Sequence, residues 1–460
     1  MNPEIFRAYD IRGIAATDLT DPVVENIGQA LATLAIQRGQ DAPRFGVGRD
    51  ARSSSTRIFE ALQRGLHRAG AHVVNLGVVP TPLVYFATFQ QGYDGSVQIT
   101  GSHNPGEYNG FKMMIGRDTL HGETIQELLR LIEDDQLVTI EGEDLGTSAW
   151  AELRKEYIEW IRDDITMGPR KLHIAMDSGN GVAGVVGPEL LRDAVGARVT
   201  ELYTEPDGTF PNHHPDPTVA ENLEDLIATV REEGCDFGVA YDGDGDRIGV
   251  VDEEGTILWG DQLLIVFARQ VLQQYPGATV IGEVKCSQTL FDAIERFGGE
   301  PVMARVGHSL IKAKIKETGA KLAGEMSGHI FFNDRYFGFD DALYATCRLA
   351  EIVSHTNQPF SALLADIPST FATAEVRREC DEAIKFDVPI KVSKFFADDY
   401  DVNTIDGVRV NFNEGWGLVR ASNTQPVVVL RAEGTSPQTR DRYMKMLEDA
   451  VANAEQTLSR

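Results

Sequence analysis

The segment RFGVGRDARSSSTRIFEALQRGLHRAGAHVVNL, residues 44–76, predicts a strand, a polar loop, a helix and a second strand in succession. Residues 44–48 are typical of a strand, and residues 49–55 form the loop. The apolar residues Phe59, Leu62 and Leu66 share one face of a helix predicted around residues 58–69, which Gly70 ends. Residues 72–76 then predict the second strand.

The same order of segments occurs twice more along the chain. A second copy runs from residue 171 to residue 202, with Gly196 as the helix stop, and a third runs from residue 279 to residue 304, with Gly298 in that place. Three diverged copies of one unit predict three α/β domains of common plan. Because open α/β sheets bind ligands at the carboxyl ends of their strands, we expect these ends to face one cleft.

The tail beyond about residue 366 has a different pattern. Residues 407–411, 416–420 and 427–431 alternate like strands, and residues 437–454 predict a terminal helix. The predicted fold class is therefore α/β, with three similar mixed α/β/α domains and a C-terminal α+β domain around one central cleft. We predict domains over residues 1–146, 147–250, 251–365 and 366–460.

The composition is that of a globular protein with a large acidic excess. The 460 residues are 42% hydrophobic and 25% charged, and the formal net charge is −27. This charge argues against a nucleic-acid partner, whose backbone requires clustered cations. It also means that any phosphate site must be cationic locally, and the candidates for that role are Arg12, Lys112, Arg247, Lys285 and Arg420.

The sequence predicts neither export nor a membrane partner. Residues 1–4 lack a basic stretch followed by an apolar one, and no apolar run approaches the ~20 residues of a spanning helix. The cysteines are far apart, without a Cys-x-x-Cys pair, which is typical of reduced structural thiols: Cys235, Cys286, Cys347 and Cys380. We expect a cytoplasmic protein.

A loop of turn-forming residues, Gly101-Ser102-His103-Asn104-Pro105-Gly106, follows the apolar run at residues 96–99. Ser102 has His103 beside it and Lys112 ten residues further on. A hydroxyl on a rigid loop near a histidine and a cation suits a nucleophile or a group carrier. The alternative is a strand-ending turn closed by Asn104-Pro105.

Three aspartates alternate with glycines after the apolar residues 237–240: Asp242, Asp244 and Asp246. Carboxylates at every second position of an extended loop favour a hard divalent cation such as Mg²⁺. A calcium EF-hand is the competing pattern, but Arg247 occupies the position that needs glycine, and the flanks are strand-like. Arg247 is placed to contact substrate or phosphate.

The loop Gly324-Glu325-Met326-Ser327-Gly328-His329 offers hydrogen-bonding groups for a sugar. Glu325 can accept two hydroxyl hydrogen bonds and Ser327 can donate or accept one. His329 is a candidate for proton transfer, because an imidazole titrates near neutral pH. The alternative is a plain polar turn.

The loop Arg420-Ala421-Ser422-Asn423-Thr424 follows another predicted strand. It supplies a guanidinium, two hydroxyls, an amide and main-chain N–H groups, which together suit a phosphate. A hairpin turn before Pro426 is the alternative. Further candidates at strand ends of the third copy are Lys285, Gly307 and His308.

A rival pattern favours a nicotinamide-dependent dehydrogenase. Residues 179–184, GNGVAG, match the dinucleotide fingerprint G-x-G-x-x-G between a strand and a helix, and Glu201 ends the next strand. Glycine-rich strand-to-helix turns are common, however, and no other segment predicts hydride chemistry.

Taken together, the serine loop, the aspartate loop and the loops at residues 324–329 and 420–426 resemble the α-D-phosphohexomutases, and within them the bacterial phosphomannomutase/phosphoglucomutase enzymes. The resemblance extends from residue 6 to residue 431, with the motifs in the family's order. It implies that Tyr9 and Arg12 lie in the active-site cleft, that residues 324–329 are the sugar-specificity loop, and that residues 420–424 bind the non-reacting phosphate.

The resemblance implies a reversible conversion of hexose 6-phosphate and hexose 1-phosphate, with mannose and glucose as the sugars. Ser102 would carry the phosphoryl group, and one Mg²⁺ per chain would bind the three aspartates and Ser102. A hexose 1,6-bisphosphate would be both intermediate and activator, and the product would feed nucleotide-sugar and polysaccharide synthesis. The catalytic set would be Ser102, His103, Lys112, Arg12, Arg247, His308 and His329, and Lys112, His308 or His329 would transfer protons.

Several alternatives remain at this stage. A phosphoglucosamine mutase is the nearest within the family, whereas a phosphatase or a sugar-phosphate-binding protein without turnover would belong to other classes. Phosphosugars are the expected partners, and we expect a monomer.

Overall fold

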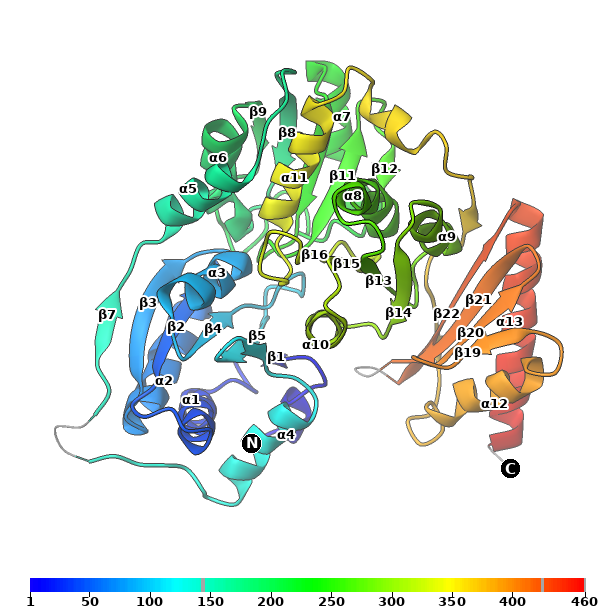
Figure 1. Cartoon of the computed structure of the whole chain (residues 1–460). Coiled ribbons are helices and arrows are strands. Elements are labelled where there is room, and N and C mark those ends of the chain that lie inside the picture. Colours follow the sequence, from blue (N-terminus) through cyan, green and yellow to red (C-terminus); the bar gives the residue numbers. More distant parts are fainter. Residues whose placement is uncertain (142–144, 423–425, 459–460) are drawn as a thin grey trace.

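Four β-sheets follow one another along the chain in the computed structural model, which describes residues 1–141, 145–422 and 426–458. Figure 1 shows the first three units, coloured blue to yellow, in an arc, with the orange and red C-terminal unit beside the third. The predicted fold class is confirmed, since the first three sheets are mixed and flanked by helices, and the last sheet is antiparallel.

The first sheet has seven strands in the order β1-β5-β4-β2-β3-β7, with β6 paired to β5. Its strands are β1 (Ile11–Ile14), β2 (Arg44–Arg49), β3 (His72–Val78), β4 (Gly95–Ile99), β5 (Tyr108–Ile115), β6 (Asp118–Thr119) and β7 (Ser148–Trp150). Its helices are α1 (Asp21–Gln37), α2 (Ser55–Arg68), α3 (Thr81–Gln91) and α4 (Glu123–Glu133). Strand β2 runs parallel to β3 and β4, whereas β5 runs antiparallel to β4.

The second sheet has the order β12-β11-β10-β8-β9. Its elements are α5 (Arg154–Asp164), β8 (His173–Asp177), α6 (Gly187–Leu190), β9 (Arg198–Leu202), α7 (Glu224–Glu233), β10 (Phe237–Tyr241), β11 (Ile248–Asp252) and β12 (Ile257–Leu258). The domain boundary predicted at residue 250 falls inside β11, and β12 extends the same sheet to Leu258.

The third sheet has the order β14-β13-β15-β16. Its elements are α8 (Gly260–Gln274), β13 (Thr279–Glu283), α9 (Gln288–Arg296), β14 (Glu300–Ala304), α10 (His308–Thr318), β15 (Leu322–Gly324), β16 (Ile330–Phe332) and α11 (Ala342–Ser354). Ser287 caps α9 by accepting a hydrogen bond from Thr289 N, as a serine before a helix commonly does.

The fourth sheet has the order β17-β22-β21-β20-β19, with β18 also paired to β22. Its elements are β17 (Phe371–Ala372), β18 (Val376–Glu379), α12 (Asp387–Phe396), β19 (Asp401–Asn403), β20 (Val408–Phe412), β21 (Gly415–Ala421), β22 (Val427–Gly434) and α13 (Pro437–Leu458). The long helix α13 packs against β22 and closes the core of this unit.

Each sheet contains one antiparallel hairpin whose loop carries a motif singled out above. The hairpins are β4–β5, β10–β11, β15–β16 and β21–β22. Their loops hold Ser102, the three aspartates, the residues from Glu325 to His329, and Ser422, respectively. The motifs therefore occupy corresponding places in four separate units.

The core joins the first three units more firmly than the fourth. One apolar cluster includes side chains of α3, α5, α8 and α11, so it runs through all three α/β units. The fourth unit has its own core, and a small cluster of Val284, Trp416 and Leu418 connects it to the third.

The helix predicted before Gly196 is broken into short segments. A 3₁₀ turn at Val182–Val185 precedes α6, and a π-helical turn at Leu191–Val195 follows it. Pro188 stands in the first turn of α6, where its missing N–H is tolerated, and it cannot continue a helix from the preceding turn.

Helices α1 and α2 cross closely enough to require glycine. A Cβ atom on Gly65 would lie 2.0 Å from the carbonyl oxygen of Glu25, and one on Gly28 would lie 2.5 Å from that of Leu62. We predict that Gly65→Ala lowers the free energy of unfolding by up to about 2 kcal/mol, measured as a lower urea midpoint. Overpacking costs about 1–3 kcal/mol, which exceeds the gain of about 1 kcal/mol in helix propensity. Glu60→Ala, an exposed change on the same helix, is the control, and an unchanged midpoint for Gly65→Ala would contradict the close crossing.

Candidate active site

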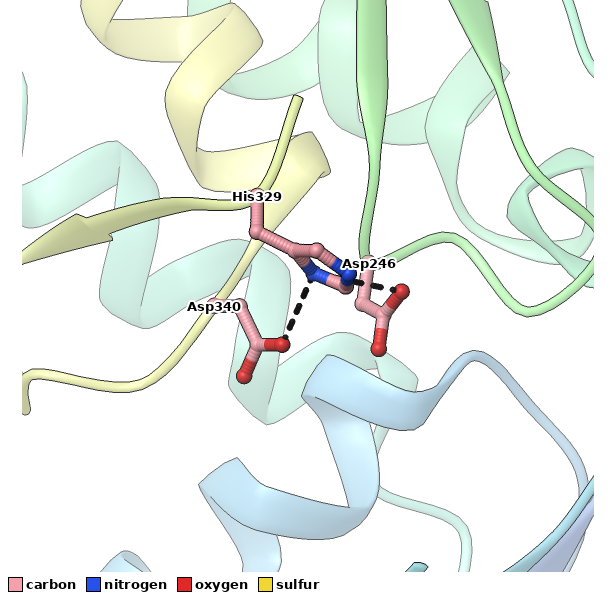
Figure 2. Close-up of side chains that lie close together, drawn as sticks. All are labelled: Asp246, His329 and Asp340. Carbon is pink, nitrogen blue, oxygen red and sulfur yellow. Dashed lines mark ion pairs between the residues drawn. The ribbon is translucent and has the colours of Figure 1, made fainter. Parts of the chain in front are cut away.

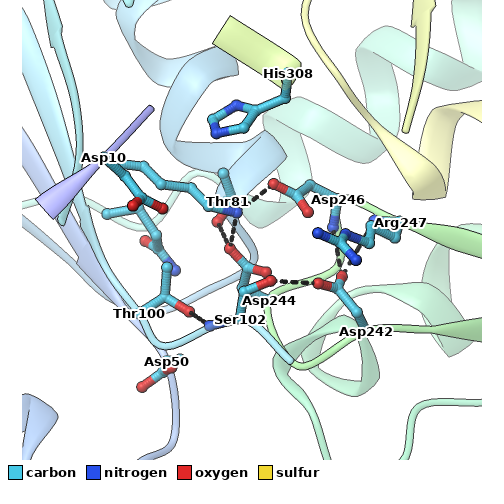
Figure 3. Close-up of polar contacts among 12 residues, drawn as sticks. Asp10, Asp50, Thr81, Thr100, Ser102, Asp242, Asp244, Asp246, Arg247 and His308 are labelled. Carbon is cyan, nitrogen blue, oxygen red and sulfur yellow. Dashed lines mark hydrogen bonds and ion pairs between the residues drawn. The ribbon is translucent and has the colours of Figure 1, made fainter. Parts of the chain in front are cut away.

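Ser102 lies at the meeting point of the first two units. Its Oγ donates a hydrogen bond to Asp242 Oδ2 at 2.6 Å and lies 3.2 Å from His103 Nδ1. The residue is buried, and its backbone has a φ of +51°, a left-handed conformation that costs a non-glycine residue free energy. Figure 3 shows Ser102 beside Asp242 and Asp244. The predicted nucleophile thus contacts the predicted metal loop directly.

The three aspartates are fully buried, and one ligand oxygen from each lies within 4.8 Å of the others. Burial, together with the charges of Asp244 and Asp246, raises the pKa of Asp242 well above its ordinary value. Hard oxygen donors in this number suit a divalent cation such as Mg²⁺. Asp244 Oδ1 and Asp246 Oδ1 have no hydrogen-bond partner among the described residues, so both are available to an ion.

Lys112, on β5, places its ammonium group against this triad. Its Nζ donates to Asp244 Oδ2 at 2.6 Å and also contacts Asp246 Oδ2. Burial alone would lower the pKa of Lys112, but the surrounding carboxylates raise it above its ordinary value. Likewise, burial would raise the pKa of Asp244, but the charge and hydrogen bond of Lys112 bring it below its ordinary value. Lys112 therefore remains a cation.

His329 is held between two units by three polar partners. Its Nδ1 lies 3.0 Å from Asp340 Oδ2 and 3.6 Å from Asp246 Oδ1, as Figure 2 shows. Arg247 Nε donates to its Nε2 at 3.0 Å. Because a guanidinium can only donate, Nε2 is the unprotonated nitrogen of neutral His329, and the proton is on Nδ1.

His308 stacks on His329 with ring centroids 5.5 Å apart. Burial and the nearby Lys312 hold the pKa of His308 well below its ordinary value, so this imidazole is neutral. The pKa of His103 is also held well below its ordinary value, first by burial and then by the charge of Arg247. Both predicted histidines therefore lie near the reacting groups without carrying charge.

Arg12 reaches the serine loop from β1. Its guanidinium donates to Asn104 Oδ1 at 3.0 Å and pairs with Asp10 at 2.6 Å. Tyr9 lies against Gly307 of the third unit, since a Cβ on Gly307 would be 2.6 Å from the Tyr9 ring. Tyr9 thus lies between the first and third units, whereas the hydrogen-bond partners of Arg12 belong to the first unit.

The predicted sugar-binding residues lie together in the third unit. Glu325 is buried, and its Oε1 accepts a hydrogen bond from Gly307 N at 2.7 Å. Lys285 pairs with Glu375 of the fourth unit at 3.1 Å. Ser327 is half-buried in the loop between Glu325 and His329.

The phosphate loop begins at Arg420, whose Nη2 lies 3.1 Å from Asp406 Oδ2. Asp406 also accepts a hydrogen bond from Val306 N of the third unit at 3.1 Å. Ser422 N donates to Val427 O and closes the hairpin. The predicted residues Asn423 and Thr424 lie outside the described residues.

Several residues at the site escaped the sequence analysis. Thr81 Oγ1 donates a hydrogen bond to Asp244. Asp340 pairs with Lys312 and lies close to His308 and His329. Glu283 accepts hydrogen bonds from Met326 N and Lys285 N. Burial raises the pKa of Glu283 to about 7. Asp50 and Arg52 contact the serine loop. Glu283 and the loop with Asp50 and Arg52 stand at the ends of predicted strands, and this position could have indicated a role in the site. No residue near Thr81 or Asp340 in the sequence indicated a distant partner.

The dinucleotide fingerprint does not form a cofactor site. Its loop is followed by the 3₁₀ turn Val182–Val185 instead of a long helix whose N-terminus could bind a pyrophosphate. Gly181 packs on the main chain of Gly243, and Val182 N donates to Gly243 O. The glycines thus support the aspartate loop, and Glu201 pairs with Arg192.

Among the described residues, no helix combines the length and the apolar composition required to cross a bilayer.

Sequence profiles of one enzyme family match the chain in four successive parts. Phosphoglucomutase/phosphomannomutase alpha/beta/alpha domain I matches residues 3–138, domain II residues 155–255, and domain III residues 259–371. The C-terminal domain of the same family matches residues 375–450.

Individual relatives agree with the profiles. Phosphomannomutase/phosphoglucomutase of Pseudomonas aeruginosa is 44% identical over 456 residues, covering 99% of this chain and 96% of that protein. Phosphoglucomutase of Neisseria gonorrhoeae is 45% identical, covering 97% and 96%. The crystal structure of a phosphoglucomutase/phosphomannomutase family protein from Burkholderia thailandensis has a TM-score of 0.91 at 42% identity, covering 99% of this chain and 98% of that one. The chain is therefore a member of the phosphoglucomutase/phosphomannomutase family, one of the α-D-phosphohexomutases.

Proposed function

We propose that this protein interconverts hexose 6-phosphates and hexose 1-phosphates of mannose and glucose through a phosphoserine at Ser102. The observation that carries the proposal is the hydrogen bond from Ser102 Oγ to Asp242, which joins a hydroxyl to a buried carboxylate triad. A hydroxyl that carries a phosphoryl group needs both a cation and a fixed position. Lys112 and the triad supply these next to Ser102.

The three aspartates would hold one Mg²⁺, with an oxygen of the phosphorylated Ser102 as a further ligand. The bound ion would offset the negative charge of the phosphoryl group and so favour its transfer. The fit rests on three converging carboxylates with two unpartnered oxygens, which is hard-cation chemistry.

In the first transfer, the bond between Ser102 Oγ and phosphorus breaks, and a bond forms between phosphorus and the free hydroxyl of the sugar. That hydroxyl's proton passes to His329 Nε2, the unprotonated nitrogen, which in this structure accepts a hydrogen bond from Arg247 Nε. Ser102 Oγ keeps the electron pair of the broken bond and takes up a proton, which returns it to the hydroxyl that donates to Asp242. Asp340 keeps the other nitrogen protonated and oriented. Lys112 is a cation committed to the carboxylates, so we assign it, with Arg12 and Arg247, to charge stabilisation. His308 and His103 carry no charge, and we assign them to positioning.

The resulting hexose 1,6-bisphosphate turns end for end and returns its other phosphoryl group to Ser102. Arg420 and Ser422 bind the phosphate that does not react, with Asn423 and Thr424 beside them in sequence. Glu325, Ser327 and Lys285 bind the sugar, next to Tyr9 and Gly307. A hexose 1,6-bisphosphate would also restore a dephosphorylated serine and so act as activator, and we propose that the enzyme is a monomer.

Replacing the nucleophile gives the direct test. We predict that Ser102→Ala lowers turnover of glucose 1-phosphate and mannose 1-phosphate by several orders of magnitude, with a modest change in affinity for the sugar phosphate. Mass spectrometry of the purified wild-type protein should locate one phosphate on the peptide with Ser102. Phosphate on another residue would refute the assignment, and stoichiometric release of inorganic phosphate would indicate a phosphatase. Glucosamine 1-phosphate as the preferred substrate would favour the glucosamine mutase.

Removing the metal should abolish turnover reversibly. We predict that a chelator removes activity and that Mg²⁺ restores it, because the carboxylate triad holds the ion. Asp244→Asn should raise the Mg²⁺ concentration needed for half-maximal rate. Asp252→Asn, at the far end of β11, is the matched control. The hydrogen bonds from Glu254 N and Thr256 N both go to Asp252 Oδ1, and asparagine keeps this oxygen. Full turnover in chelator would contradict the role of the triad.

Arg420 should contribute to substrate binding more than to the transfer step. We predict that Arg420→Ala raises KM for the sugar phosphates roughly 10–100-fold, the effect of losing a charge-assisted hydrogen bond of about 1.5–3 kcal/mol. Arg378→Ala is the control in the same sheet, since Arg378 pairs with Glu455 on α13. An unchanged KM for Arg420→Ala would place the phosphate elsewhere.

A further inference from the structure

Arg52 uses every N–H of its guanidinium around the serine loop. Its Nη2 donates to Ser102 O at 2.8 Å and to Asn104 O at 2.6 Å. Its Nη1 donates to Pro105 O at 2.5 Å and to Tyr108 O at 3.1 Å. Its Nε donates to Asp50 Oδ2 at 3.0 Å. A guanidinium has five N–H hydrogens, and here all five have an acceptor.

Asp50 fixes this guanidinium and also binds the loop itself. Besides Arg52 Nε, its Oδ2 accepts a hydrogen bond from Gly101 N at 3.1 Å, immediately before Ser102. Its Oδ1 accepts from Ser55 Oγ at 2.5 Å and from Arg52 N at 3.1 Å. The side chains of Arg52 and Asp50 therefore hold residues 101 to 108 together by binding their main-chain atoms.

The second unit seals the pair from solvent. The Arg52 side chain has no exposed surface, and its guanidinium carbon lies 5.3 Å from the centre of the Phe210 ring. Gly208 packs on the main chain of Ala51 and Arg52. A charge in this position is stabilised by Asp50, the four carbonyl oxygens and the aromatic face, so its geometry is fixed by many contacts at once.

We propose that Arg52, anchored by Asp50, is a positioning residue for the phosphoryl carrier: its guanidinium holds the serine loop by four carbonyl groups and so keeps Ser102 in the left-handed backbone conformation that directs Oγ to Asp242. A left-handed serine persists only where its surroundings over-determine it. The bond from Arg52 Nη2 to Ser102 O acts on the strained residue itself, and those to Asn104 and Pro105 fix the turn after it.

The role requires arginine in particular. A lysine ammonium has three donors on one atom, so it cannot reach four carbonyl groups spread over residues 102 to 108. The inference rests on the proposed function, because a displaced Oγ affects turnover only if Ser102 carries the phosphoryl group. A misplacement of about 1 Å at a reacting atom costs about 100-fold in rate.

The test compares Arg52→Lys and Arg52→Ala with the wild type. We expect Arg52→Lys to lower kcat roughly 100-fold, with KM for glucose 1-phosphate unchanged, because the sugar- and phosphate-binding residues belong to other loops. We expect methylguanidinium at millimolar concentration to restore part of the turnover of Arg52→Ala but none of that of Ser102→Ala. Asp50→Asn should lower kcat less than Arg52→Lys does, and it replaces Arg52→Ala if that variant does not fold.

Arg57→Lys is the matched control. Arg57 belongs to the same unit and also donates to two carbonyl groups, Ala15 O at 2.8 Å and Leu19 O at 3.0 Å. We expect this variant to keep the wild-type kcat. An equal fall in kcat for both lysine variants, or a wild-type kcat in folded Arg52→Lys, would overturn the proposal.

A crystal structure of Arg52→Lys tests the backbone part without relying on turnover. We expect Ser102 to leave the left-handed region and its Oγ to lose the hydrogen bond to Asp242. An unchanged Ser102 would overturn the proposal even if kcat falls. A wild-type enzyme that turns over no hexose phosphate would instead refute the proposed function, and the crystal structure would still decide the role of Arg52.

Discussion

Three buried carboxylates within 4.8 Å of one another repel strongly, and the protein relieves this repulsion by supplying positive charge at the same place and by raising the pKa of Asp242. Lys112 supplies it from β5 of another unit, and its pKa is raised because three carboxylates surround it. This ion pair cluster brings the first and second units together where Ser102 meets Asp242. Breaking it by removing one partner would leave an uncompensated buried charge, which is among the costliest changes in a protein interior.

The three α/β units support their hairpin loops in related ways. In each α/β unit a hairpin loop holds the predicted site residues, and the end of a parallel strand, or the loop that follows that strand, supports the hairpin loop. Arg52 donates to the serine loop, Val182 N donates to Gly243 O of the aspartate loop, and Glu283 accepts from Met326 N of the sugar loop. The support is a guanidinium in the first unit, where the loop must hold a strained serine, and simple hydrogen bonds in the other two.

The fourth unit contacts the third through Arg409, beside Lys285, one of the predicted sugar-binding residues. Arg409, buried in β20, donates to the carbonyl oxygens of Val284 and Cys286, on either side of Lys285. Its guanidinium lies 3.9 Å from the centre of the Trp416 ring. Strand β21 continues from Trp416 to Arg420. The contacts of Arg409 therefore couple the position of Arg420, in the predicted phosphate loop, to that of Lys285. In the proposed function, the phosphate and the sugar would thus be bound by two units that contact each other directly.

The net charge of −27 makes the local cations necessary. In the proposed function, a phosphosugar approaching this surface would meet repulsion until it reached Arg12, Arg247, Lys285 and Arg420. Several of these cations are paired with carboxylates, as Arg12 is with Asp10 and Arg420 with Asp406. These acids hold the cations in place, and in the proposed function a bound phosphate would compete with them.

The sequence by itself determined the α/β plan and indicated the candidate site residues, because both depend on local spacing. Apolar periodicity marked the strands and α2, and turn-forming residues marked the loops of Ser102 and of the three aspartates. It did not determine the breaks beside α6, which depend on Pro188, or the extension of the second sheet to Leu258. Only the tertiary structure decided which loops meet: Ser102 and Asp242 are 140 residues apart, and Arg52 reaches the serine loop from 50 residues away. The role of Thr81 depends on Asp244 of another unit, and no local pattern records the packing of one unit on another. The role of Asp340 depends on Lys312 and the two histidines, which come from other segments of its own unit.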